Sequence, residues 1–270
     1  MHSDETLQCA PCDSCAFDGQ IVLITGAASG IGRAIALDTV RLGADVACCD
    51  IDESGLEALR KEISAAGTQA RSFVDAADIA VADSIRQFVE NAVRVLGVPT
   101  VLFANAAVTD KKHHRVVDMP IDTWDRVMQV NLSGTFYTVR AVLPYMLKAG
   151  HGNIVAITSI LGQKGNGRAQ DAPYCASKFG IEGLVEVVAD ECMPYGINVN
   201  TLYPSTRVNT GFFDYLSADE RQLLSPPEIV LDAARFLAGL RPGSLTRRSV
   251  DAERWSSDPD YRCAVANWSC

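Results

Sequence analysis

The sequence lacks an excess of positive charge: 33 Asp and Glu outnumber 24 Lys and Arg, and the formal net charge at pH 7 is -9. Such a protein repels duplex nucleic acid and anionic membranes, so we expect neither as a partner. No uninterrupted apolar run reaches the roughly 18 residues that indicate a membrane-spanning helix. The first residues, 1–5, carry acid where a secretory signal carries Lys or Arg, so we expect no export signal. These absences predict a soluble, cytoplasmic protein.

An ordered cysteine framework is absent as well. The chain has nine cysteines, an odd number at irregular spacing, which is not the pattern of a disulfide-stapled domain. Buried thiols are expected at the four that lie in apolar or helical patterns, Cys48, Cys49, Cys175 and Cys192. Cys9, Cys12 and Cys15 could supply three thiolates to zinc or an iron cluster, but no fourth ligand has matching spacing. We therefore expect no metal site.

Repeats, low-complexity blocks and long polar linkers are also missing. With 270 residues and 48% hydrophobic residues, the chain can bury one sizeable core. We expect one catalytic domain at 19–250, between a disordered N-terminal tail at 1–18 and an atypical C-terminal tail at 251–270. Short β-branched runs alternate there with stretches of helical period. The predicted fold class is α/β, a single doubly wound Rossmann-type domain with a parallel sheet of six to seven strands.

The alternation also predicts the position of each element. Strands are expected at 21–24, 45–50, 69–74, 100–104, 153–158, 198–203 and, faintly, 245–250. Helices are expected at 30–43, 52–67, 80–96, 120–148, 171–193 and 226–240. Pro144 lies inside the fourth of these helices, which it is expected to kink or to end early.

A glycine-rich turn follows the first predicted strand and opens the first helix. Its sequence is Thr25-Gly26-Ala27-Ala28-Ser29-Gly30-Ile31-Gly32. The three glycines let the backbone turn tightly and let a pyrophosphate approach the amides at the positive end of the helix. In this strand, turn and helix context we predict a dinucleotide site formed by Gly26, Ser29, Gly30, Ile31 and Gly32.

Asp50 ends the second predicted strand, roughly 20 residues after the turn, where a carboxylate would accept hydrogen bonds from the adenosine ribose. A 2′-phosphate would be repelled there, so the cofactor is expected to be NAD rather than NADP. Alternatively, Asp50 caps the next helix, a role that Asp52 could fill instead. The nearby cations Arg33 and Arg41 both fit an exposed helix face.

Tyr174 and Lys178 are four residues apart in a predicted helix, so they lie on one face and can meet over one ligand. A free phenol has a pKa of about 10, and a cation beside it favours the phenolate, which can exchange a proton with an alcohol. The spacing alone also fits an exposed pair without chemistry. Its position downstream of a dinucleotide turn favours a catalytic role.

Together these motifs resemble the short-chain dehydrogenase/reductase family over about residues 19–210. The family pattern Thr-Gly-x-x-x-Gly-x-Gly stands at 25–32, and Tyr-x-x-x-Lys stands at 174–178. Between them, Asn105 and Ala106 resemble the family's Asn-Asn-Ala-Gly cofactor contacts, with alanine in its first and last places. Asn131 resembles its helix asparagine, and Ser159 its catalytic serine. Chance does not account for five elements in this order and spacing.

The resemblance implies an NAD-dependent oxidoreductase that interconverts a secondary alcohol and a ketone, and a homodimer or homotetramer. Tyr174 would exchange the proton, Lys178 would hold the nicotinamide ribose and lower the tyrosine pKa, and Ser159 would orient the reacting oxygen. Asn131 would anchor a water that links Lys178 to solvent, and Asp75 would contact adenine. Either of these last two could instead make a helix-kink or loop hydrogen bond.

Three segments depart from the family pattern. The loop between Ser159 and Tyr174 is slightly long, contains Gly162, Gly165 and Gly167, and is expected to border the substrate. After the sixth predicted strand, Pro204-Ser205 stands where the family has Pro-Gly. The C-terminal segment 246–253 is shorter and more charged than the family's ending, so its last strand and any oligomer contact on that edge are in doubt.

Val208 and Thr210 are the best match to the family's nicotinamide contacts. Four apolar residues follow, Phe212, Phe213, Tyr215 and Leu216, which could cover a small to medium, fairly apolar substrate as a lid or could pack a short helix. A second hypothesis for the whole chain is a dinucleotide-binding protein that acts by interaction, which the intact Ser159, Tyr174 and Lys178 disfavour. A third is a metal or redox protein that acts through the cysteines of the N-terminal tail.

Overall fold

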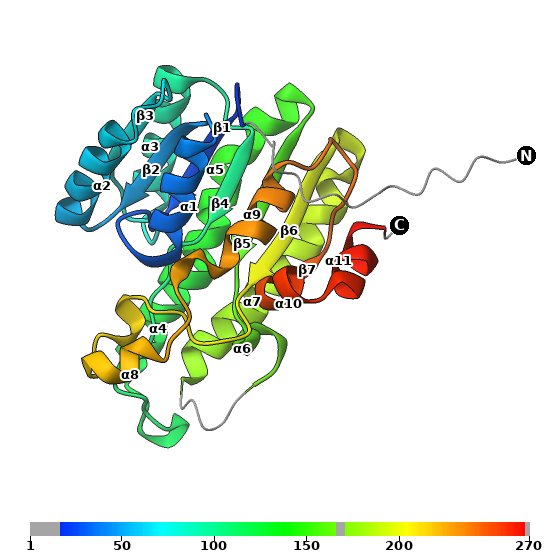
Figure 1. Cartoon of the computed structure of the whole chain (residues 1–270). Helices are drawn as coiled ribbons and strands as arrows, with labels where there is room; N and C mark the ends of the chain where they lie inside the picture. The colour runs from blue at the N-terminus through cyan, green and yellow to red at the C-terminus, as the bar shows by residue number, and fades with distance from the viewer. Residues whose placement is uncertain (1–16, 166–170, 268–270) are drawn as a thin grey trace, which may run out of the picture.

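One seven-stranded sheet forms the centre of the molecule (Figure 1). The computed structural model describes residues 17–165 and 171–267. The strand order is β3-β2-β1-β4-β5-β6-β7, and all six pairings are parallel. The strands are β1 Ile21–Thr25, β2 Asp45–Asp50, β3 Ser72–Ala76, β4 Val101–Ala104, β5 Gly152–Ile157, β6 Ile197–Tyr203 and β7 Ser249–Asp251. The predicted doubly wound α/β fold is therefore confirmed, with the larger of the two strand numbers.

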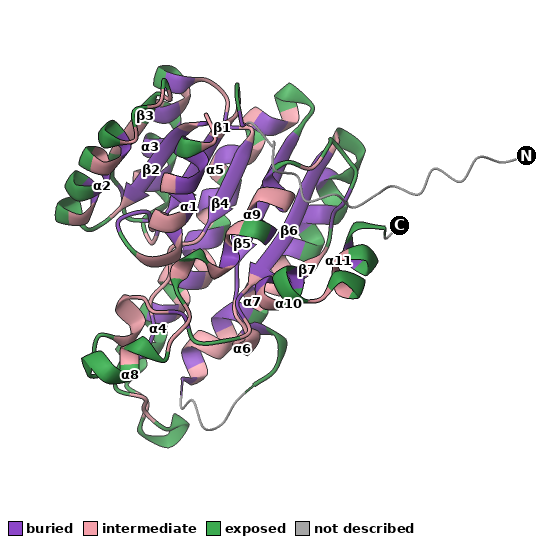
Figure 2. Cartoon of the chain, in the orientation of Figure 1, coloured by how far each residue is buried: buried purple, intermediate pink, exposed green. Residues whose placement is uncertain are grey.

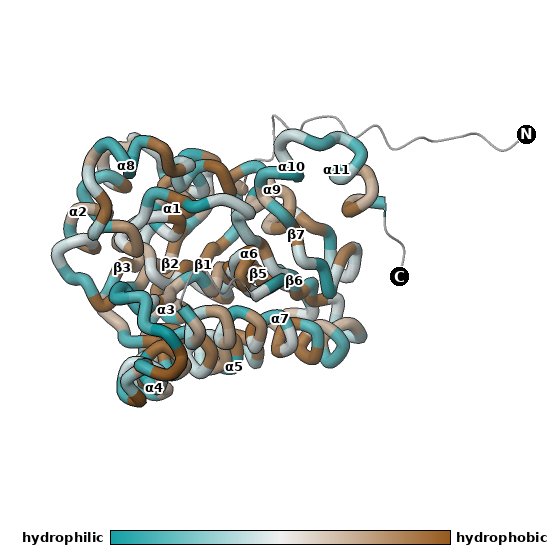
Figure 3. Tube along the Cα trace, turned by 90° about the horizontal axis from the view of Figure 1, so that it is seen from below, coloured by the Kyte–Doolittle hydropathy of each residue, from teal (hydrophilic) through white to brown (hydrophobic). Residues whose placement is uncertain are grey.

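Helices cover both faces of this sheet, as Figure 3 shows along the layers. The α-helices are α1 Gly30–Arg41, α2 Glu53–Ala65, α3 Ala82–Leu96, α4 Ile121–Met128, α5 Gly134–Ala149, α6 Ile160–Gln163, α7 Ala172–Cys192, α8 Ala218–Gln222, α9 Leu231–Ala238, α10 Ala252–Ser257 and α11 Pro259–Ala266. Helices α1, α2, α9 and α10 contribute to one hydrophobic core, and α3, α5 and α7 to the other. Because β4 and β5 are buried along their whole length, they are apolar runs rather than alternating ones (Figure 2).

Several element boundaries differ from the predictions. Strand β3 begins at Ser72 rather than at residue 69, because the preceding Arg71 instead binds the Asp45 carboxylate through its side chain and backbone. The helix predicted at 120–148 is divided by a π-helical turn, Gln129–Ser133, into α4 and α5. Pro144 does not end α5, which continues to Ala149. Pro144 and Arg140 are both exposed, so water can satisfy the Arg140 carbonyl that the proline leaves unbonded.

Both tail assignments are modified within the described residues. Phe17, placed in the N-terminal tail by the sequence, is 1% exposed and donates its backbone N–H to the Leu42 carbonyl at 2.8 Å. At the other end, α10 and α11 were not predicted, yet Trp255 is 5% exposed and stacks on Phe236 of α9 at 4.2 Å between ring centroids. The folded domain therefore includes residue 17 and extends beyond residue 250.

No helix within 17–165 and 171–267 is long and apolar enough to cross a membrane. The same residues contain no group of three or more His, Cys, Asp or Glu side chains placed to hold a metal ion. Cys9, Cys12 and Cys15 lie outside the described residues. Cys48, Cys49 and Cys192 are buried free thiols as predicted, whereas Cys175 is only partly buried.

Candidate active site

The glycine turn joins the carboxyl end of β1 to the amino end of α1. Gly26 and Gly30 have φ angles of 68° and 54°, a conformation that favours glycine. Gly32 has no room for a side chain, because a Cβ there would overlap the Gly26 carbonyl oxygen. Ser29 is the N-cap of α1 but makes no side-chain cap hydrogen bond, and the first turn, which includes Ile31, contains no acid. The first amides of α1 thus meet no competing anion from their own helix.

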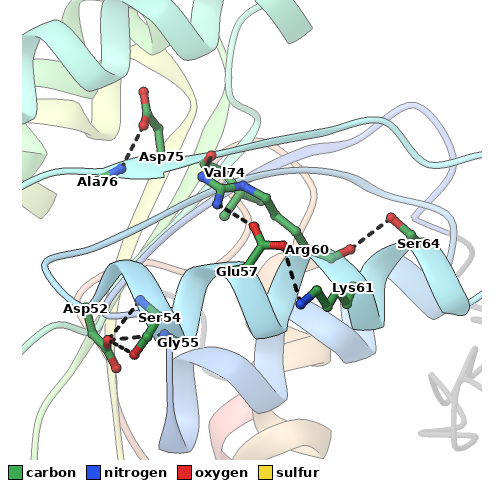
Figure 4. A network of polar contacts seen from close by, with 10 residues as sticks. All are labelled: Asp52, Ser54, Gly55, Glu57, Arg60, Lys61, Ser64, Val74, Asp75 and Ala76. Atoms are coloured by element: carbon green, nitrogen blue, oxygen red, sulfur yellow. Dashed lines mark hydrogen bonds and ion pairs between the residues drawn. The ribbon is translucent and has the colours of Figure 1, made fainter.

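Asp50 lies at the end of β2 beside this turn. Its carboxylate accepts hydrogen bonds from the backbone N–H groups of Ala28 at 3.1 Å, Ile51 at 2.7 Å and Asp52 at 3.1 Å. The helix cap that was the alternative role for Asp50 belongs to Asp52, which accepts from the first amides of α2 (Figure 4). Asp50 therefore holds the turn rather than the helix that follows it.

The cations near Asp50 have other partners or positions. The Arg33 guanidinium forms an ion pair with Glu62 of α2. Arg41, in the last turn of α1, is exposed, as the sequence predicts. Neither residue makes an ion pair with the Asp50 carboxylate in the part of the chain described.

A hollow of about 320 Å³ lies between α2 and β3, beyond Asp50. Asp75 lines it, and its carboxylate accepts a hydrogen bond from the next backbone N–H, of Ala76, at 2.9 Å (Figure 4). Arg60 crosses from α2 to donate to the Val74 carbonyl at 2.7 Å and to Glu57 at 3.2 Å. Asp75 Oδ1 thus makes a local backbone hydrogen bond, which was the alternative to a contact with adenine. Asp75 Oδ2 takes no part in this bond.

Asn105 and Ala106 follow β4 and lie against the glycine turn. The Asn105 side chain donates to the carbonyls of Thr25 at 2.9 Å and Gly26 at 3.2 Å. The backbone N–H groups of both residues donate to the Thr25 hydroxyl, at 3.1 and 3.2 Å. These bonds fix the end of β4 to the end of β1, so the Asn105 amide supports the turn.

Ser159, Tyr174 and Lys178 meet where β5 ends and α7 begins. Ser159 is the N-cap of α6, and its hydroxyl accepts from Leu161 N–H at 3.2 Å and is hydrogen-bonded to Tyr174. The Lys178 ammonium lies 5.5 Å from the centre of the Tyr174 ring and donates to the Ile157 carbonyl at 2.8 Å. The three residues are at the carboxyl edge of the parallel strands, where open α/β sheets bind ligands.

Burial sets the ionisation of this group. It raises the pKa of Tyr174 above its ordinary range, whereas the hydrogen bond with Ser159 lowers it and the Asp171 charge raises it further. Burial also lowers the pKa of Lys178 to about 8, against the opposing charge of Glu182. Ser159 is the group that opposes burial at Tyr174, and the expectation that Lys178 lowers the tyrosine pKa stays a prediction.

Asn131 lies in the π-helical turn and is fully buried. Its side-chain oxygen accepts from Val108 N–H at 2.8 Å, and its side-chain nitrogen donates to the Val108 carbonyl at 2.9 Å and to Ser177 Oγ at 3.0 Å. The side chain thus bonds the loop after β4 to α7. This is the loop hydrogen bond that the sequence left open beside a role in holding water.

The segment after β6 reaches both the glycine turn and the tyrosine. Val208 is 5% exposed and forms an isolated parallel bridge with Ser225. The Thr210 methyl group is so close to Gly30 that a Cβ at Gly30 would lie 2.9 Å from it. Among the apolar residues predicted to form a lid or a short helix, Phe212 lies in the 3-10 turn Gly211–Phe213, as the second alternative has it. Its ring meets the Tyr174 ring edge to face at 5.7 Å, and a lid over the substrate stays a prediction.

The sequence did not single out a buried polar cluster next to Tyr174. Thr109 donates its hydroxyl to the Asp171 carboxylate, and the Asp110 N–H donates to the same carboxylate at 3.4 Å. Asp110 in turn accepts from the N–H and the imidazole of His114, at 2.8 and 2.9 Å. The only signal was proximity in sequence, since Thr109 follows the Asn105 motif and Asp171 precedes Tyr174 by three. Gly167, in the loop expected to border the substrate, lies outside the described residues.

The family model for short chain dehydrogenases matches residues 20–221. The chain belongs to the short-chain dehydrogenase family. It is 34% identical over 230 residues to D-threitol dehydrogenase of Mycolicibacterium smegmatis, with 82% of this chain and 86% of that protein covered. Members of this family are oxidoreductases that use NAD or NADP, so this chain is a dehydrogenase or reductase acting on a small molecule.

Two solved structures support the same family assignment. A short-chain type dehydrogenase/reductase from Mycobacterium marinum matches with a TM-score of 0.82 at 26% identity, covering 93% of this chain and 100% of that one. A structure described as an NAD(P)-dependent gluconate 5-dehydrogenase from Beutenbergia cavernae, with NADP bound at low occupancy, matches with a TM-score of 0.77 at 28% identity, covering 90% and 99%. The fold of this short-chain dehydrogenase is thus the family's along nearly its whole length.

Proposed function

We propose that this protein is an NAD(H)-dependent oxidoreductase that interconverts a secondary alcohol and a ketone. The observation that carries the proposal is the meeting of Ser159, Tyr174 and Lys178 at the carboxyl edge of the sheet, with Thr210 linking that edge to the glycine turn. A pair of hydrogen-bonded hydroxyls beside a buried ammonium is a suitable acid–base group for an alcohol. The proposal assigns the catalytic roles to these three residues and to Asn131.

The residues around the glycine turn fit a dinucleotide. The first amides of α1 meet no side-chain cap and no acid, which suits a pyrophosphate. Asp50 would receive the adenosine ribose, and Asp75 and the hollow beside it the adenine. The other contacts in the proposed site are Gly26, Ser29, Gly30, Ile31, Gly32, Asn105, Ala106, Tyr174, Lys178, Val208 and Thr210. When bound, the dinucleotide supplies or accepts the hydride.

The protein's own groups handle the proton. Tyr174 donates it to a ketone oxygen or removes it from an alcohol, and Ser159 orients that oxygen by a hydrogen bond. Lys178 holds the nicotinamide ribose and, together with the positive oxidised ring, opposes the burial that raises the tyrosine pKa. Asn131 keeps the loop after β4 beside α7, and we assign to it the water that carries the proton toward solvent.

NAD is proposed over NADP because the Asp50 carboxylate would repel a 2′-phosphate, and because Arg33, in the first turn of α1, is already paired with Glu62. The NADP-bound Beutenbergia structure makes this a point to be measured. The substrate is proposed to be small to medium and fairly apolar, because Phe212 contacts Tyr174. Exposed Phe136 on α5 and Phe179 on α7 support a homodimer or homotetramer.

The test is the oxidation of a panel of secondary alcohols with NAD and with NADP, followed by the absorbance of the reduced cofactor. Wild type should turn over at least one alcohol with NAD. Asp50→Ala should reduce the ratio of activity with NAD to activity with NADP. Tyr174→Phe should lower kcat by roughly 10²–10⁴-fold while NADH still binds. Undiminished turnover in Tyr174→Phe would refute the mechanism, and dinucleotide binding without any turnover would favour a protein that acts by interaction.

A further inference from the structure

The carboxylate of Glu253, the second residue of α10, is bonded to the loop that follows β6. It accepts from the backbone N–H of Ser205 at 2.7 Å and of Thr206 at 3.1 Å. It also accepts from the Thr206 hydroxyl, and the Ser205 hydroxyl lies 3.0 Å from it and 3.0 Å from Asp251. These bonds lower the pKa of Glu253 despite its partial burial, so the carboxylate is charged at neutral pH.

The two ends of this contact lie in two of the three segments that depart from the family pattern. Ser205 stands where the family has the glycine of Pro-Gly, and Glu253 follows the stunted last strand. Glycine has no hydroxyl, so it could not bond the two carboxylates as Ser205 does. The two departures are therefore complementary parts of one contact.

The C-terminal helices hold this carboxylate in a fixed place. Trp255, two residues after Glu253, is 5% exposed and stacks on Phe236 of α9 at 4.2 Å between ring centroids. The Tyr261 hydroxyl accepts the backbone N–H of Asp251 at 2.9 Å. This packed aromatic anchor and this bond fix the start of α10 against the folded domain.

Thr206 connects Glu253 to both ends of the segment that covers the active site. Its hydroxyl lies 2.9 Å from that of Ser225, and the Ser225 N–H donates to the Arg207 carbonyl at 2.9 Å. The Asn209 N–H donates to the Ser225 carbonyl at 2.8 Å, beside the bridge made by Val208. The two ends of the segment 207–225 are thus hydrogen-bonded to each other, and Glu253 holds these ends, which we call the base of the segment.

The closed segment is the one that contacts the active site. Thr210 packs against Gly30 of the glycine turn, and Phe212 meets the Tyr174 ring at 5.7 Å. A shift of the base at 205–206 would therefore be passed to the proposed nicotinamide contacts and to the cover of the tyrosine. In Figure 1, α10 lies near the carboxyl end of β7, at the same edge of the sheet as α6.

From this geometry we propose that Glu253 is a positioning residue for the nicotinamide end of the dinucleotide. It fixes the base of the segment 205–225, and that segment sets the places of Val208, Thr210 and Phe212. The inference rests on the proposed function for the identity of the ligand. It extends the proposed cofactor site to the C-terminal helix α10, which contributes Glu253.

The experiment compares Glu253→Ala, Glu253→Gln and Arg262→Ala with wild type. Amide hydrogen exchange of residues 204–225, measured without cofactor, shows how firmly the two ends of the segment are held. Fluorescence titration with NADH gives the dissociation constant of NADH. Arg262→Ala is the matched control, because it removes bonds inside the C-terminal helices without touching Ser205 or Thr206. Melting temperatures show how much each substitution destabilises the fold.

In Glu253→Ala the amides of Ser205 and Thr206 should exchange roughly 10-fold faster or more, and the NADH dissociation constant should rise about 10-fold. Glu253→Gln keeps one of the two acceptor oxygens but turns an NH2 group toward one backbone N–H, so its affinity should lie between those of Glu253→Ala and wild type. Arg262→Ala should change the affinity less than about twofold. Unchanged affinity in Glu253→Ala, or an equal loss in Arg262→Ala at equal melting temperature, would overturn the proposal. Failure of wild type to bind NADH would contradict the proposed function, whereas the exchange rates would still decide whether Glu253 holds the base.

Discussion

The two sides of the candidate site are built in different ways. On the dinucleotide side, backbone conformation determines the shape of the site. Gly26 and Gly30 have positive φ angles, and a Cβ at Gly32 would have no space. On the substrate side, side chains from distant segments bond one another, as Thr109 does with Asp171 and Asn131 with Ser177. The glycine positions tolerate almost no other residue type, whereas the side-chain pairs can be substituted one pair at a time.

This difference indicates where the chain can acquire its own specificity. A turn fixed by glycine presents the same amides to any dinucleotide, so it serves the shared step of the family's reactions. Loops fixed by exchangeable pairs can move a pocket wall without disturbing that step. We therefore expect substitutions on the dinucleotide side to abolish binding, and those on the substrate side to alter it by degrees.

The largest effect is expected for Gly32→Ala. The added methyl group would overlap the Gly26 carbonyl oxygen and lie 2.6 Å from the Asn105 side-chain nitrogen, so the turn must shift. NADH affinity should fall by roughly 100-fold or more, and the free energy of unfolding should drop by about 1–3 kcal/mol. Fluorescence titration with NADH and denaturant unfolding measure the two changes.

Gly183→Ala is the control for this substitution. Gly183 lies in α7, and a Cβ there would meet nothing within 4 Å. Because alanine favours a helix, this variant should bind NADH like wild type and be stabilised by up to about 1 kcal/mol. If Gly32→Ala bound NADH normally, backbone constraint would not be what distinguishes the two sides.

The next prediction concerns Lys178, which belongs to both sides. Burial lowers its pKa from 10.5 to about 8, so at pH 7 the folded protein holds a desolvated charge. Lys178→Met should abolish turnover yet raise the free energy of unfolding at pH 7 by about 1–2 kcal/mol, after the loss of the bond to the Ile157 carbonyl is subtracted. Denaturant unfolding of both proteins across pH measures the difference.

The pH dependence of that gain has a definite sign. Below about pH 8 the lysine is protonated in both the folded and the unfolded states, and the full penalty remains. Between about 8 and 10.5 the folded state loses the proton first, so wild type gains stability and the difference from Lys178→Met should shrink. A difference that grows with pH in this range would contradict the assignment of a buried, charged lysine.

A smaller effect is expected for Thr109→Val on the substrate side. It removes the hydroxyl that donates to the buried Asp171 carboxylate, whose pKa is already raised by burial. The free energy of unfolding should fall by about 1–2 kcal/mol, because a buried acceptor loses its partner. NADH affinity should remain within about twofold of wild type, since the glycine turn is untouched. If the free energy of NADH binding fell as much as the free energy of unfolding, the two sides would not be independent.

The dinucleotide side was readable from the sequence because its constraints are local. The turn at 25–32, Asp50 at the end of β2 and the Tyr174–Lys178 spacing each lie within one strand, turn or helix. The parallel arrangement of the strands also followed from alternation, since parallel strands need crossover helices, whereas their order in the sheet did not. A parallel sheet of six to seven strands and the family could therefore be predicted before any contact was known.

The remaining features depend on contacts that no local pattern encodes. Asp171 and Thr109 are 62 residues apart, and Glu253 and Ser205 are 48 apart. Neither pair has a periodicity or a motif, and the C-terminal helices were read as a tail because their apolar residues, such as Trp255, bury against α9 rather than the sheet. The burial that raises the pKa of Tyr174 likewise depends on distant contacts rather than on a local pattern.

Phe212→Leu gives the smallest predicted effect and the finest test of the comparison. The Phe212 ring meets Tyr174 edge to face at 5.7 Å, a contact that contributes about 0.5–1.5 kcal/mol beyond area burial. Leucine keeps an apolar side chain but loses the ring, so KM for an alcohol substrate should rise about 2–10-fold at nearly unchanged NADH affinity. Phe213→Leu is the matched control, since Phe213 pairs with Tyr215 rather than with Tyr174. Equal changes in both variants would mean that the segment acts as general apolar packing, whereas a change confined to Phe212→Leu would identify it as the part of the cover that senses the substrate.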